Sequence, residues 1–171
     1  RQNDNARLDC YIPTRILYFS FPHLLCIFAQ SYTQKMKTYI DCFIAWTDEQ
    51  QGQATENALR NDGNVANIYH LTESIGSSKT IRYIAETATA PYVLLYTKYD
   101  TLQLGYHALD RMLTIAQDHA ALMLYADHYV TLPTGERQAM PLIDYQTGSV
   151  RDDFQMGSLL LISTEGLKRY I

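Results

Sequence analysis

Short apolar runs of strand type alternate with segments of helical periodicity from Met36 onward. Strands that are separated by helices in this way pair in parallel, and the helices cover both faces of the sheet. Three apolar runs predict strands, at 39–45, 65–71 and 92–96. The helical patterns that follow them lie at 48–60, from Ser77 or Ser78 to about Ala88, and at 103–119. The alternation therefore predicts an α/β domain built on a parallel sheet.

The helix predicted at 103–119 has the clearest register of the three. Its apolar residues fall on one helical face, which we expect to cover the sheet: Leu104, Ala108, Met112, Ile115 and Ala116.

The remainder of the chain departs from simple repetition of strand and helix. A fourth strand is predicted at 121–132, and the turn residues at 133–135 lead into an antiparallel partner at 137–143. A loop at 144–156 and a short apolar strand at 157–162 follow, and a helix is expected to open at Thr164.

The composition is that of an ordinary globular domain, with 47% hydrophobic and 19% charged residues among 171. The formal net charge is −4, and Lys and Arg are scattered along the chain, so we expect no nucleic-acid partner. Three cysteines without metal-ligand spacing or a disulfide framework predict a reducing compartment, and hence a cytoplasmic location.

The first 35 residues do not share the alternating pattern, and we expect the domain to span 36–171. An apolar stretch at 16–29 is interrupted by Pro22 and His23 and is shorter than the roughly 20 residues of a membrane-spanning helix. We therefore expect no transmembrane segment and interpret 1–35 as upstream, non-domain sequence. A secretory signal is the alternative, because Arg15 precedes the apolar stretch and Ala29 lies near its end.

The turn at 97–100 follows a buried strand and is the first candidate site. In open α/β sheets, ligands bind at such carboxyl ends of strands. The Asp100 carboxylate can hold a divalent cation that bridges a diphosphate, and Lys98 can neutralise a phosphate. The alternative role of Asp100 is to cap the helix that follows, and spacing alone favours it, because Asp is a preferred N-cap residue.

Asp127 and His128 form the second candidate. Asp127 interrupts an apolar strand, so its carboxylate needs hydrogen bonds, a ligand or a metal. Because neighbouring side chains in a strand face opposite sides, we do not expect His128 to share a ligand with Asp127. Three other histidines have no second ligand at zinc-like spacing: His70, His107 and His119.

Asp152 and Asp153 follow Arg151 in the predicted loop and form the third candidate. Two carboxylates at this place can bind sugar hydroxyls or an acceptor, or supply a base. A solvated charge cluster is the alternative, and the charge pattern alone favours it.

In their order, these segments resemble the family 2 glycosyltransferases with the GT-A fold, particularly the Bacteroides-type members. The run APYVLLYTKYDTLQLGYHALDRM is similar to that family's third strand, metal turn and helix. The run LMLYADHYVTLPTGERQAMPLIDY is similar to its next strand and glycine-turn hairpin, and SVRDDFQMGSLLLISTEGL to the segment that leads toward the acceptor half. The resemblance covers Met36 to Ile171.

The resemblance implies a Rossmann-like GT-A sheet with flanking helices and an antiparallel hairpin, truncated at its C-terminus. It implies transfer of a sugar from a nucleotide-diphosphate donor to a hydroxyl of a saccharide or lipid-linked acceptor, in polysaccharide or glycoconjugate synthesis. Such a protein would lie in the cytoplasm or at the inner face of the membrane.

The matched positions also imply site residues. The donor-binding residues would be Ala45, Trp46, Thr47, Glu49, Thr72, Thr97, Lys98, Tyr99 and Asp100. Asp100 and Asp127 would hold Mg²⁺ or Mn²⁺, and Asp152 and Asp153 would lie on the acceptor side. No residue is assigned as the catalytic base. Because Thr97 and Tyr99 stand where the family has its usual pair of aspartates, a noncatalytic nucleotide-binding or interaction domain of the same fold is the alternative function.

Overall fold

The computed structural model describes residues 7–10, 38–46, 49–142 and 156–171. Its larger sheet has five strands in the order β3–β2–β4–β9–β6. These strands are β2 (Ile40–Ala45), β3 (Val65–Leu71), β4 (Tyr92–Tyr96), β6 (Met123–Tyr125) and β9 (Leu159–Ser163). The first three are mutually parallel, whereas β9 is antiparallel to both β4 and β6. The prediction of a parallel sheet is therefore right for β3, β2 and β4 and wrong beyond them.

The direction of β9 follows from the edge at which the chain enters it. Tyr96 at the end of β4 pairs with Leu159, and Tyr125 at the end of β6 pairs with Leu160. The chain thus leaves β6 and enters β9 at the same edge of the sheet. A parallel neighbour would require a crossover to the opposite edge, so the strand that returns directly is antiparallel.

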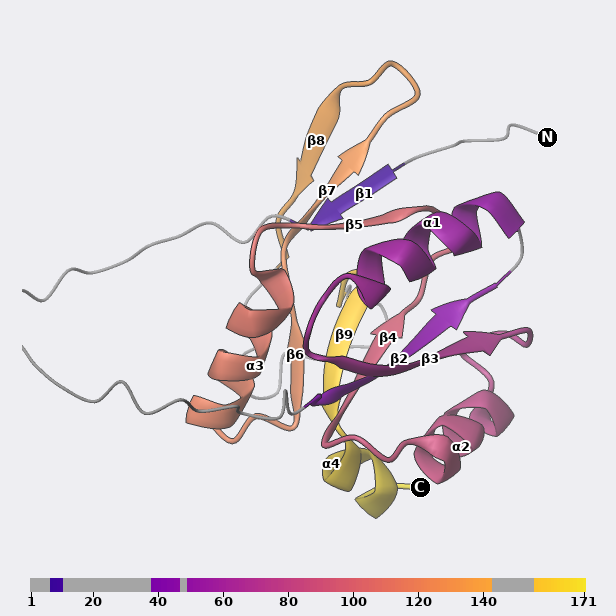
Figure 1. The fold of residues 1–171 in the computed structure, drawn as a ribbon, viewed down its shortest axis with the longest axis vertical. Coiled ribbons are helices and arrows are strands. Elements are labelled where there is room, and N and C mark those ends of the chain that lie inside the picture. Colours follow the sequence, from indigo (N-terminus) through magenta and orange to yellow (C-terminus); the bar gives the residue numbers. More distant parts are fainter. Residues whose placement is uncertain (1–6, 11–37, 47–48, 143–155) are drawn as a thin grey trace, which may run out of the picture.

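Helices cover both faces of the five-stranded sheet, as predicted (Figure 1). On one face, α1 (Glu49–Arg60) and α3 (Ala108–Asp118) bury Leu59 and Met112 against Ile44. On the other face, α2 (Ser78–Thr87) and α4 (Thr164–Arg169) cover Phe43, which packs with Ile84 of α2. Within the described residues, no helix has the length and apolar composition needed to cross a membrane.

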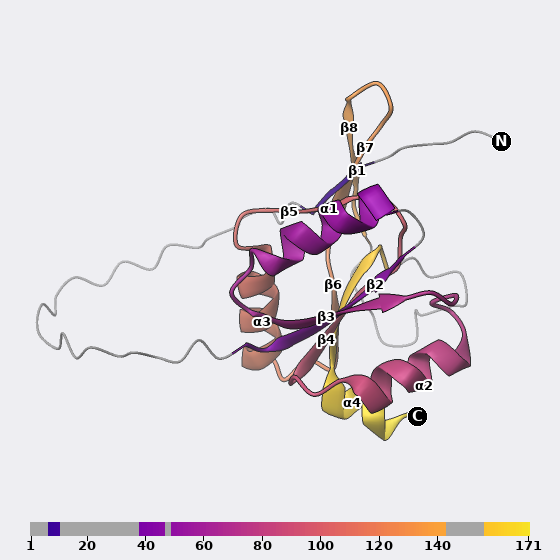
Figure 2. The ribbon, with the colours of Figure 1, turned by 45° about the vertical axis from the view of Figure 1, so that its right-hand side comes forward.

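A second, smaller sheet has the order β5–β1–β7–β8. Its strands are β1 (Arg7–Cys10), β5 (Leu102–Leu104), β7 (His128–Thr131) and β8 (Arg137–Met140). The β7–β8 hairpin extends away from the five-stranded sheet (Figure 2). Its predicted turn is confirmed, because the Gly135 N–H donates to the Leu132 carbonyl at 2.8 Å and Gly135 has a φ of +85°, which glycine adopts without strain. β1 is the described part of 1–35, and the domain boundary at Met36 stays a prediction.

The predicted strand at 121–132 is wrong as one element. It is divided into β6 and β7, which belong to different sheets, with Ala126 and Asp127 between them. Asp127 Oδ1 accepts a hydrogen bond of 2.7 Å from the Leu142 N–H, which ties this break to the far end of the hairpin. Apolar residues flank the break on both sides, so Asp127 alone marks it in the sequence.

The predicted helix at 103–119 begins five residues later, at Ala108. Residues 102–104 are instead strand β5, which pairs with β1, and the Leu102 N–H donates to Thr55 Oγ1 at 3.0 Å. Asp100 therefore lies too far upstream to cap the helix, whose N-cap residue is His107. The predicted face is also partly wrong, because Ile115 is 41% exposed; its place is taken by Leu109 and Leu113, which are buried with three predicted residues: Ala108, Met112 and Ala116.

The other predicted elements are close to those observed. The helix at 48–60 is confirmed as α1, the strands at 65–71 and 92–96 as β3 and β4, and the helix at Ser77 as α2 with Ser77 as its N-cap. The final apolar strand and the helix at Thr164 are confirmed as β9 and α4. The predicted loop at 144–156 falls almost wholly outside the described residues.

Asp41, which interrupts the apolar strand β2, is fully buried at the edge where the parallel strands begin. One carboxylate oxygen accepts from Asn67 Nδ2 at 2.8 Å. The other accepts from the N–H groups of Thr89 and Ala90 at 2.7 and 2.8 Å, and from the Thr89 hydroxyl at 3.2 Å. Burial favours the neutral acid, but these hydrogen bonds outweigh it and lower the pKa of Asp41. The carboxylate thus fixes the connection between α2 and β4.

Candidate functional site

The polar residues predicted to bind a donor gather at the edge where the parallel strands end. Ala45 of β2 pairs with Leu71 of β3, and Ile44 pairs with Tyr96 of β4. Trp46, Thr72 and Thr97 follow these strands directly and therefore lie along one edge. Ligands of open α/β sheets bind in the crevice at this edge.

Trp46 forms one corner of the site, against helix α1. Its backbone N–H donates to the Leu71 carbonyl at 3.0 Å, and its indole stacks on the His70 imidazole with ring centroids 3.9 Å apart and planes at 20°. Gly52 of α1 lies against the indole, because a Cβ there would be 2.6 Å from Trp46 Cε3. The helix therefore needs a glycine at this position despite glycine's low helix propensity.

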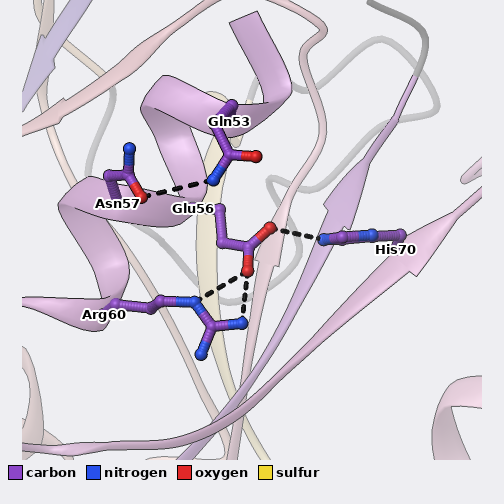
Figure 3. Close-up of polar contacts among 5 residues, drawn as sticks. All are labelled: Gln53, Glu56, Asn57, Arg60 and His70. Carbon is purple, nitrogen blue, oxygen red and sulfur yellow. Dashed lines mark hydrogen bonds and ion pairs between the residues drawn. The ribbon is translucent and has the colours of Figure 1, made fainter. Parts of the chain in front are cut away.

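Glu56 of α1 lies between His70 and Arg60 and contacts both (Figure 3). Its side chain is 9% exposed; Oε2 lies 2.9 Å from His70 Nε2, and Oε1 accepts from Arg60 Nε at 2.7 Å. Burial alone would raise the pKa of Glu56, but the hydrogen bonds and charges of Arg60 and His70 lower it. The imidazole is thus fixed between a carboxylate and an indole. The Glu56–Arg60 spacing of four residues was visible in the sequence, whereas the packing of β3 against α1 was not.

A cavity of about 250 Å³ lies at the other side of the β3 end, against helix α2. It is lined by the last residues of β3, by Thr72 and Glu73, and by the first turns of α2. Lys79 Nζ donates to Glu73 Oε1 at 2.5 Å, and Thr80 Oγ1 donates to the Ser74 carbonyl at 2.8 Å. Thr72, predicted to contact the donor, is therefore part of an actual concavity.

The turn at 97–100 is anchored to the start of β9. The N–H and the hydroxyl of Thr97 donate to the Ser158 carbonyl at 2.8 and 3.2 Å. Lys98 and Tyr99 are exposed, and Asp100 is half-buried. Burial raises the pKa of Asp100, and the nearby charge of Lys98 opposes that rise without cancelling it. Among the described residues, only the charge of Lys98 stabilises the ionised carboxylate of Asp100.

His128 lies beside this turn with its side chain buried. The residue is 8% exposed, and its Nδ1 has no hydrogen-bond partner among the described residues. Burial lowers the pKa of His128, as does the charge of Lys98, while a hydrogen-bond contact of the ring with the Ala126 carbonyl and the charge of Asp127 raise it. Asp127 is exposed, and it lies between β6 and β7 rather than in a strand, so the alternation expected for it and His128 does not apply.

The described residues do not supply a metal site. No three His, Cys, Asp or Glu side chains among them lie close enough together to hold an ion. Asp127 already accepts a hydrogen bond from the hairpin, and Asp100 is accompanied by a lysine. The described residues therefore do not form a metal site by themselves, and the Mg²⁺ or Mn²⁺ that the family resemblance implies stays a prediction.

Some predicted site residues cannot be placed. Thr47, Asp152 and Asp153 lie outside the described residues, and Glu49 is described only as the first residue of α1.

Comparisons of the chain with models of protein families, with curated proteins and with solved structures found no match.

Proposed function

We propose that this chain is the donor-binding part of a glycosyltransferase, which moves a sugar from a nucleotide diphosphate to a hydroxyl of a saccharide or lipid-linked acceptor. One observation carries the proposal: the ends of β2, β3 and β4 bring Trp46, Thr72 and the 97–100 turn to one edge of the sheet. This is the edge at which nucleotides bind in open α/β sheets. The proposal places the reaction in polysaccharide or glycoconjugate synthesis, in the cytoplasm or at the inner face of the membrane.

The contacts at this edge suit the two halves of such a donor. The cavity beside Thr72, at about 250 Å³, offers a concave wall for part of a nucleoside, with Tyr83 as an aromatic lining residue. The turn at 97–100 offers Lys98 and a backbone anchored to β9, which suits a diphosphate. In a glycosyltransferase, these groups would hold and orient the donor while the acceptor hydroxyl approaches its anomeric carbon.

Trp46 provides a direct test, because it is the single tryptophan of the chain and stands at this edge. We expect nucleotide diphosphates to change its fluorescence in a saturable way and to raise the melting temperature, with one base preferred in a panel of UDP, GDP, ADP and CDP. A mutation in the cavity, Thr72→Tyr, should weaken the response, whereas Thr114→Tyr on the exposed face of α3 should not. If none of the four compounds changes either signal, the proposal is wrong.

A noncatalytic nucleotide-binding domain is the second candidate, and the single carboxylate of the 97–100 turn favours it. The two candidates differ in turnover. Release of free sugar or its transfer to an acceptor, followed with the nucleotide sugar whose diphosphate binds best, would exclude the noncatalytic role. Saturable binding without turnover would favour it.

A further inference from the structure

We propose that strand β3 is a pairing edge, at which two copies of this chain associate in antiparallel orientation and join their five-stranded sheets. The inference goes beyond the proposed function, because it concerns the outer side of β3 and not the ends of the strands. β3 is the outermost strand of its sheet, with α1 on one face and α2 on the other (Figure 1). Among the described residues, it pairs only with β2.

Two residues of β3 direct their backbone polar groups away from the sheet. The Leu71 carbonyl accepts from the N–H of Trp46, which follows β2, so the backbone of Leu71 faces β2. Successive residues of a strand direct their N–H and C=O groups to opposite sides, so Tyr69 also faces β2, whereas Ile68 and His70 face outward. The register irregularity of this pair lies at the start of the strand, before these residues. No other described strand pairs with the outward groups of Ile68 and His70.

The other three edges of the two sheets, as far as the structure describes them, carry features that oppose such pairing. β5 and β6 have three residues each, and β8 begins with the charged residues Glu136 and Arg137 beside its turn. β3 has seven residues, VANIYHL, with no proline, acidic residue, lysine or arginine among them. Natural sheets protect long exposed edges with charges or proline, and an edge without them is a template for another chain.

A second copy fits this edge because the outward residues are self-complementary in antiparallel pairing. Ile68 of one copy would lie opposite His70 of the other, and the reverse, so that each outward N–H and C=O has a partner. The twofold axis then passes beside Tyr69, which packs against Phe43 on the face that α2 covers. The two Tyr69 side chains would form an aromatic pair across the strands, and such pairs stabilise a sheet.

The charges at the two ends of β3 also favour antiparallel pairing of identical copies. Arg60 and Asp62 precede the strand, and Glu73 and its partner Lys79 follow it, so both ends carry charges of either sign. Antiparallel pairing brings the start of one strand to the end of the other, where each of these side chains meets an opposite charge. Parallel pairing would place each side chain beside its own copy, and like charges opposite one another are destabilising.

Sedimentation velocity of the full chain from about 5 to 500 µM should show a monomer–dimer equilibrium, because a contact along one strand is smaller than the interface of a permanent dimer. Hydrogen exchange locates the contact. The amides of Ile68 and His70 should exchange rapidly in the monomer, and about tenfold more slowly once about nine-tenths of the chain is dimeric.

A matched pair of variants tests the edge itself. Ala66→Lys places a charge at an exposed position of β3 and should weaken dimerisation by about tenfold. Ala139→Lys makes the same change at an exposed position of β8 and should leave dimerisation unchanged. Both variants should retain the wild-type melting temperature, because both positions are exposed.

Four results would overturn the pairing edge. The first is a chain that stays monomeric at every concentration. The second is a dimer in which the amides of Ile68 and His70 exchange as fast as in the monomer, since the copies would then associate elsewhere. The third is slow exchange of these amides in the monomer, because another part of the same chain would then cover β3. The fourth is equal dimerisation of Ala66→Lys and wild type. None of the four bears on nucleotide binding, which the fluorescence of Trp46 tests separately.

Discussion

The buried polar groups at the two ends of the parallel strands differ in their hydrogen bonds and in the direction of their pKa shifts. Where the strands begin, Asp41 is fully buried and accepts four hydrogen bonds, and its pKa is lowered. Where they end, Asp100 is half-buried with a raised pKa, and His128 keeps a ring nitrogen without a partner among the described residues. The first arrangement stabilises the fold. The second leaves hydrogen-bonding capacity that the described residues do not use, which is typical of sites that bind a ligand.

The largest effect is expected from Asp41→Ala. This change removes the acceptor for Asn67 and for the backbone N–H groups of Thr89 and Ala90. Leaving such groups unsatisfied should lower the free energy of unfolding by about 3 kcal/mol. Urea denaturation followed by circular dichroism measures the loss.

Two further variants show whether this loss has the proposed cause. Asp41→Asn keeps one acceptor oxygen and should cost less than Asp41→Ala. Asp118→Ala, at the exposed end of α3, should change stability by no more than about 0.5 kcal/mol. An Asp41→Ala cost as small as that of Asp118→Ala would show that the edge where the strands begin is not held by this carboxylate, and the contrast between the two ends would disappear.

The same carboxylate should give the fold a defined dependence on acid. Because the folded pKa of Asp41 lies below its ordinary value of 3.8, its stabilisation is complete above that value and is lost as the pH falls through the folded pKa. The stability difference between wild type and Asp41→Asn should therefore shrink as the pH is lowered below about 3.8. We expect chemical denaturation at pH 7, 4 and 2.5 to show this convergence. A difference that stays constant over the range would mean that Asp41 is not ionised in the folded protein.

Much of the fold could be predicted because its elements are local. Helices α1 and α2 and strands β3 and β4 follow from periodicity and from Ser and Asn–Asp–Gly signals at their ends. The errors occur where partners distant in the sequence decide the structure. Residues 102–104 are a strand because β1 and Thr55 supply hydrogen bonds to them, and neither is visible from the local pattern of a helix.

The position of the candidate site could be predicted from the sequence, but the contacts of its side chains could not. The rule that ligands bind at the carboxyl ends of parallel strands directs attention to Thr72 and the 97–100 turn. It does not reveal that His70 is held between Glu56 and Trp46, since this depends on how β3 packs on α1. It also does not reveal that His128 lies against the backbone of Gly157, 29 residues further along the chain (157 − 128).

Glu56→Gln tests the edge where the parallel strands end, at the corner where Glu56 contacts Arg60 and His70. Its effect on the free energy of unfolding should be intermediate. The amide keeps one acceptor but loses the charge that Arg60 and His70 share. We expect the free energy of unfolding to fall by about 1 kcal/mol. Because His70 would be held less firmly on the indole, the emission of Trp46 should also change.

Glu86→Gln is the matched control, since Glu86 is exposed on α2. It should alter neither the stability nor the emission spectrum. If Glu56→Gln behaves in the same way, Glu56 does not fix the His70 ring, and the Trp46 corner is less rigid than the contacts indicate.

The smallest effect, and the one with the opposite sign, is expected from Asp100→Asn. A carboxyl group whose folded pKa is raised destabilises the folded state at neutral pH, and that penalty vanishes below the ordinary pKa of 3.8, where both states are protonated. The amide should therefore raise the free energy of unfolding at pH 7 by about 0.5 kcal/mol, within the usual range for a partly exposed position. At pH 3 the two proteins should be equally stable. A loss of stability in Asp100→Asn at pH 7 would mean that this carboxylate is satisfied in the folded chain after all, and that the two ends of the sheet do not differ in the way their contacts suggest.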